Sequence, residues 1–79
     1  MAVTGIDDKL ERRARAALAK SPFYELRALS VEQRDNSLWI SGGVSRFYYK
    51  QLAQEVVRSV DAEITVVNSI RVDPEEEPR

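Results

Sequence analysis

The stretch 38–45, Leu-Trp-Ile-Ser-Gly-Gly-Val-Ser, constrains the fold more than any other part of the chain. Its first three residues have the composition of a strand. Gly42 and Gly43 then permit a positive φ or a close backbone approach that a Cβ would block. We therefore predict that the two glycines have a structural role and stop the strand, and that Ser45 caps a following helix.

Apolar residues at helical spacing occur on both sides of this stretch. The first pattern predicts a helix over about 5–19. It ends before Pro22, because the residue preceding a proline disfavours the α region. The second pattern predicts a helix over about 46–60. The apolar positions are Ile6, Leu10, Ala14, Ala17 and Leu18 in the first pattern and Tyr49, Leu52, Ala53, Val56, Val57 and Val60 in the second.

A short helical turn can begin at Pro22, with Ser21 as its cap. We expect Phe23 and Leu26 to point inward from this turn. Tyr24 should lie at the rim, where its hydroxyl reaches water.

Apolar and polar residues alternate in three further segments, which predict strands. The strands are 29–34, 38–40 and 64–72, and the turn 35–37 joins the first two as a hairpin. One face should hold Leu29, Val31, Leu38 and Ile40 of the hairpin and Ile64, Val66, Ile70 and Val72 of the last strand. The predicted order is therefore helix, strand, strand, helix, strand.

The composition excludes several classes of function. The 79 residues include no cysteine and no histidine, so the chain has no disulfide, no thiolate metal site and no histidine base. The net charge is +3 over 1–60 and −4 over 61–79, which argues against a nucleic-acid-binding protein. We expect neither enzymatic activity nor a cofactor.

The chain shows no signal peptide and no apolar run near the roughly 20 residues of a membrane span. We therefore expect a soluble protein that stays in the compartment where it is made, which is the cytoplasm for the sequence as given. One domain should span 4–73, and 74–79 should form a disordered acidic tail.

Three segments carry a resemblance to a known family. The segment 38–44 combines apolar alternation with Ser-Gly, one free position and Val, and 66–72 contains an Asn after paired valines. Between them lies the helical stripe of Ala53, Val56, Val57 and Val60. In this order, over roughly residues 6–72, they resemble the BON domain of bacterial osmotically inducible and nodulation-type proteins. The chain departs from the family pattern at Ala62-Glu63, where the family usually has Gly-Val, and at Asn36-Ser37, where glycine is frequent.

The resemblance implies an α+β fold of order α-β-β-α-β, a two-layer sandwich with two helices on one face of a three-stranded mixed sheet. It also implies a binding module, often proposed to contact phospholipid, that has no catalytic residues. Family members are mostly periplasmic or envelope proteins, or modules beside other domains. Function inferred in this way is an analogy.

Trp39 is the first candidate contact residue. If Leu38 and Ile40 face the helices, Trp39 lies with Val67 on the open face of the sheet, because side chains alternate along a strand. Either long arginine stems cover the ring, or the ring belongs to an interface. A stacking site for a small molecule is a third alternative.

The segment 46–50, Arg-Phe-Tyr-Tyr-Lys, is the second candidate. Aromatic and basic side chains at a helix start can enter an anionic headgroup layer. Alternatively, Tyr49 and one of its two aromatic neighbours complete the core. Together with Trp39, the candidate contact residues are Arg46, Phe47, Tyr48 and Lys50.

The remaining polar features favour structural roles. Gly42 and Gly43 lack the lysine and spacing of a phosphate-binding loop, so backbone geometry is the favoured explanation. Asn68 lies on the core side of the last strand and needs partners for its amide, most simply backbone groups of a neighbouring loop.

Two hypotheses follow. The first is a non-enzymatic binding or assembly module that contacts an anionic membrane surface or a protein partner. The second is a structural domain that forms a homodimer across the open sheet face around Trp39. We expect no nucleic-acid partner.

Overall fold

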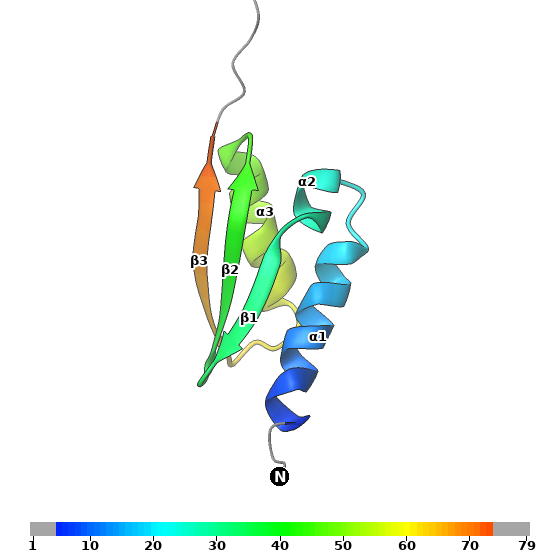
Figure 1. Ribbon diagram of the computed structural model, residues 1–79, viewed down its shortest axis with the longest axis vertical. Helices are drawn as coiled ribbons and strands as arrows, with labels where there is room; N and C mark the ends of the chain where they lie inside the picture. Colours follow the sequence, from blue (N-terminus) through cyan, green and yellow to red (C-terminus); the bar gives the residue numbers. More distant parts are fainter. Residues whose placement is uncertain (1–4, 74–79) are drawn as a thin grey trace, which may run out of the picture.

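The computed structural model describes residues 5–73, with side chains from Lys9 onward. Along the chain, the elements are α1 (Gly5–Ala19), α2 (Tyr24–Arg27), β1 (Ser30–Arg34), β2 (Ser37–Val44), α3 (Phe47–Arg58) and β3 (Thr65–Val72). The strands form one sheet in the order β1-β2-β3, with β1 antiparallel and β3 parallel to β2. The helices lie against one face of this sheet (Figure 1). The predicted α+β sandwich with a mixed three-stranded sheet is therefore confirmed.

Two predictions fall partly outside this part of the chain. The acidic tail 74–79 and the first residue of the predicted domain, Thr4, are not among the described residues, and neither is the side chain of Ile6.

The first helix has the bounds that its apolar periodicity predicts. Ala14 and Leu18 are buried, and Leu10 and Ala17 are half-buried. The predicted turn after it is α2, whose Leu26 is fully buried. The prediction that Ser21 caps this turn is wrong, because α2 begins at Tyr24 with Phe23 as its N-cap and has no side-chain capping bond. The Ser21 hydroxyl instead accepts the Phe23 N–H at 3.0 Å, which lies before the helix.

The hairpin of β1 and β2 also forms as predicted. Its turn contains Asp35 with φ of 53°, a conformation that Asp tolerates better than most residues. Val31 pairs with Ile40, and both are buried beneath the helices, as is Leu38. The core is completed from all layers by Ala14, Leu18, Leu26, Val44, Ala53, Val57 and Ile70.

The prediction that the glycines stop the second strand is wrong. Strand β2 continues through Gly42 and Gly43 to Val44, because β3 pairs alongside it and both glycines have partners there, Ile70 and Arg71. Gly42 does adopt a positive φ, 130°, as the sequence allows. The local sequence therefore indicates the unusual backbone conformation of Gly42 correctly, but it does not indicate where the strand ends.

The prediction that Ser45 caps the next helix is also wrong. The N-cap of α3 is Arg46, which makes no side-chain capping bond. The Ser45 hydroxyl instead donates to Glu25 Oε2 at 2.6 Å. Helix α3 buries Ala53 and Val57 most completely, so the stripe predicted for it does face the core.

Candidate functional site

Five aromatic residues gather where α2 and α3 begin, and we call this surface the aromatic end. Its members are Phe23, Tyr24, Phe47, Tyr48 and Tyr49. The ring of Phe23 lies 5.4 Å from that of Tyr49 and 6.3 Å from that of Tyr48, measured between centroids. Tyr48 and Tyr49 are 5.4 Å apart. Two segments that are distant in sequence thus build one cluster.

The outer members of this cluster are open to solvent. Tyr24 is 67% exposed, Phe47 59% and Tyr48 57%. Phe23 and Tyr49 pack against the core. The alternative that Phe47 or Tyr48 completes the core beside Tyr49 is therefore wrong. Phe23, which comes from the segment before α2, contributes the second aromatic ring instead.

Basic side chains flank the aromatic end. Arg46 is exposed and Lys50 is half-buried at the start of α3, and Arg27 is exposed at the end of α2. Arg27 donates to the Ser21 carbonyl at 2.9 Å. Within residues 9–73, none of the three cations forms an ion pair. The ion pairs of this part of the chain join Glu11 to Arg15, Glu32 to Arg34, and Arg71 to Asp73.

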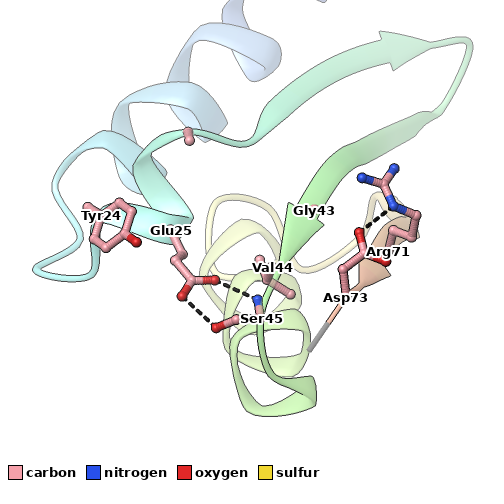
Figure 2. Close-up of a pocket in the computed structure, with 8 residues that line it drawn as sticks. Tyr24, Glu25, Gly43, Val44, Ser45, Arg71 and Asp73 are labelled. Atoms are coloured by element: carbon pink, nitrogen blue, oxygen red, sulfur yellow. Dashed lines mark hydrogen bonds and ion pairs between the residues drawn. The ribbon is translucent and has the colours of Figure 1, made fainter. Parts of the chain in front are cut away.

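An open groove of about 430 Å³ lies next to the aromatic end, between α2 and the ends of β2 and β3. Figure 2 shows Tyr24 and Glu25 on one side of it and the Arg71–Asp73 ion pair on the other. The Glu25 carboxylate accepts the Ser45 N–H at 2.7 Å as well as the Ser45 hydroxyl. The turn before α3 therefore already holds an anionic group of the chain itself, which leaves the phosphate-loop alternative without support.

Trp39 lies on the open face of the sheet, as predicted. It is half-buried and stands between Glu32 of β1 and Val67 of β3 in the strand register. The Arg34 guanidinium sits over its ring, 4.5 Å from the centroid, and is held by Glu32 at 3.1 Å. The structure thus shows the first of the three alternatives for Trp39, in which an arginine side chain covers the ring.

Asn68 has the structural environment that its position requires. Its Nδ2 donates to the Lys50 carbonyl and to Gln54 Oε1, each at 3.0 Å, and its Oδ1 accepts the Ile70 N–H at 3.1 Å. The partners are in helix α3 and in β3 itself, not in a loop as expected. Gln54, whose Oε1 accepts one of these bonds, is half-buried.

The candidate residues fall on two separate surfaces. Arg46, Phe47, Tyr48 and Lys50 lie together at the aromatic end, whereas Trp39 lies on the sheet face opposite the helices. Sequence reasoning missed the contribution of Phe23 and Tyr24 to the first surface. The signal available for them was Pro22, which predicts that a short helix begins close to these two aromatic residues.

Among residues 5–73, no helix is both long and apolar enough to cross a membrane. This part of the chain also contains no group of three or more acidic residues arranged to hold a metal ion. A comparison with protein-family models finds no matching family, and a comparison with curated proteins finds no match.

Proposed function

We propose that this chain is a non-enzymatic binding module that docks its aromatic end onto an anionic phospholipid surface. The observation that carries the proposal is the exposure of Phe47 and Tyr48 beside cations that have no ion-pair partner among the described residues. This function agrees with what the resemblance to the BON domain implies. A chain without histidine or cysteine also offers little for bond chemistry.

The aromatic side chains supply the apolar part of the contact. Phe47 and Tyr48 are adjacent at the first turn of α3, so both can enter a headgroup layer at once. Burying about 100 Å² of apolar surface from one ring stabilises the bound state by about 2.5 kcal/mol. The inner rings of Phe23 and Tyr49 both pack against the ring of Tyr48, which lowers the entropy that this side chain loses on binding.

The basic side chains supply the electrostatic part. Each Lys or Arg near an anionic membrane contributes about 1 kcal/mol, and the effect falls off within a Debye length. Arg27, Arg46 and Lys50 are available for this, since none of them forms an ion pair within residues 9–73. Glu25 is bonded to Ser45 and Asp73 to Arg71.

The alternative of a homodimer across the open sheet face has weaker support. The ring of Trp39 is the largest apolar group on that face, and the Arg34 guanidinium already covers it. A protein partner for the aromatic end would use the same residues, and the lipid test separates the two cases.

The test is co-sedimentation with vesicles of phosphatidylglycerol and phosphatidylcholine, with pure phosphatidylcholine as the lipid control. We expect salt-sensitive binding to the anionic vesicles only. Phe47→Ala and Arg46→Glu should each weaken it about tenfold or more. Arg58→Glu is the matched control, since Arg58 is exposed at the far end of the same helix.

No binding to anionic vesicles at low salt would overturn the lipid proposal and leave a protein partner as the explanation. An equal loss in the Arg58→Glu variant would show that total charge, and not the aromatic end, drives the interaction.

A further inference from the structure

The free edge of β1 is closed by side chains of α1. Glu11 Oε1 accepts the Gln33 N–H at 2.9 Å, and Arg15 Nη2 donates to the Val31 carbonyl at 3.4 Å. Both bonds are made on the side of β1 that faces away from β2. Glu11 and Arg15 are in turn ion-paired at 2.8 Å. A further strand therefore cannot add to this edge without displacing the pair.

The other edge of the sheet is β3, and no helix or strand lies beyond it in Figure 1. Two bonds at its ends fix its orientation. The N–H groups of Thr65 and Asp73 donate toward β2, to the carbonyls of Asn36 and Val44. Alternate residues therefore point their N–H and C=O groups outward. These outward residues are Val66, Asn68, Ile70 and Val72.

The β3 edge lacks the features that usually protect an edge strand. It has no lysine or proline, and its register with β2 is continuous, without a bulge. Its one charged residue, Arg71, is paired with Asp73 at 2.6 Å. Among the outward N–H groups, that of Ile70 donates to a side chain, the Asn68 Oδ1 two residues away. The outward backbone groups of β3 are thus available as a template for another strand.

We propose that a second copy of this chain adds its β3 to this edge, antiparallel, with the two-fold axis at Ser69. In this register Val66 faces Val72 and Asn68 faces Ile70, so every outward residue exchanges backbone hydrogen bonds with the other copy. The bond from Ile70 to Asn68 Oδ1 opens, and the same N–H donates to the second copy.

The charges and helices are compatible with this arrangement. Arg71 falls opposite Val67 of the second copy, so no like charges meet. Helix α3 packs on both β2 and β3, so the two α3 helices of the dimer lie side by side on the same face of the joined sheet. The result is one six-stranded sheet. The aromatic ends face away from each other, so the dimer does not depend on the lipid-docking proposal.

The test is sedimentation velocity of the full chain over a concentration series, without lipid. Ser69 is exposed on the open face and meets itself at the two-fold axis. We expect Ser69→Asp and Ser69→Lys each to weaken dimerisation about fivefold, because like charges then lie directly opposite. An equimolar mixture of the two variants should restore it, because the charges are then opposite in sign.

The matched control is Ser41→Asp. Ser41 is the exposed neighbour of Ser69 on β2, in the same row of the same face but not at the edge. We expect this variant, and Trp39→Ala, to dimerise like the unaltered chain. A chain that stays monomeric at every concentration would overturn the proposal. Equal weakening by Ser41→Asp or Trp39→Ala would also overturn it, in favour of a dimer through the sheet face.

Discussion

Replacing Gly42 by alanine tests the most unusual backbone position of the fold. Gly42 has φ of 130°, and a Cβ built on it would lie 2.8 Å from Leu29 Cδ2. A side chain in such a conformation costs about 1–3 kcal/mol, and displacing Leu29, which packs against the core, adds about 1 kcal/mol. We expect Gly42→Ala to lower the free energy of unfolding by about 2–4 kcal/mol in total.

The neighbouring glycine provides the matched control. Gly43 has no positive φ in this region, and a Cβ added to it would meet the flexible end of Arg71, with Nη2 at 3.0 Å. Gly43→Ala should therefore change stability by less than about 1 kcal/mol, since loss of a glycine also restricts the unfolded chain.

Urea denaturation followed by the fluorescence of Trp39, the one tryptophan, measures both variants. Gly42→Ala should also lower the Tm by about 10–20 °C for a domain of this size. If Gly42→Ala were as stable as the unaltered chain, or if Gly43→Ala were equally destabilised, the strained position would not be Gly42.

Three further predictions concern side chains. Glu25→Ala should lower the free energy of unfolding by about 1–3 kcal/mol, because two polar groups of Ser45 lose their acceptor, and Glu25→Gln should lower it less. Urea denaturation measures both variants, and equal stability of the two variants and the unaltered chain would contradict the role of these bonds. In the same assay, Asn68→Ala should lower the free energy of unfolding by about 2 kcal/mol, since it removes the side-chain bonds from β3 to α3. An unchanged stability would show that these bonds do not hold the helix on the sheet. Arg34→Ala should increase the quenching of Trp39 fluorescence by iodide and lower the free energy of unfolding by about 1 kcal/mol or less. Unchanged quenching would mean that the guanidinium does not cover the ring.

Patterns that depend on local periodicity were predictable from the sequence. The first helix, the hairpin and the core side of each strand follow from apolar spacing, which reflects one face turned toward the core. Val31, Ile40 and Ile70 are buried for this reason. The positive φ of Gly42 was likewise within reach, because glycine is the residue that tolerates it.

Features that depend on pairing between distant segments were not predictable in this way. The glycines belong to β2 because β3, some 28 residues further along the chain, pairs with them. Ser45 does not cap α3 because Glu25, 20 residues earlier, competes for its hydroxyl. The covered edge of β1 depends in the same manner on Glu11 and Arg15 of α1.

The same distinction between local patterns and distant contacts applies to the candidate site. The exposure of Phe47 or Tyr48 follows from helix geometry, since adjacent helical residues cannot both face the core. That Phe23 packs beside Tyr49 while Phe47 and Tyr48 are both exposed does not follow from helix geometry. Such a contact is set by tertiary packing and leaves no local signal.

The most direct test of lipid docking through the aromatic end is an amide chemical-shift titration of the chain with phosphatidylglycerol-containing bicelles. We expect the largest shifts at residues 23–27 and 45–50, where the aromatic end lies, and we expect added salt to reduce them. Shifts centred on Trp39 and Val67, or no shifts at low salt, would contradict this docking mode.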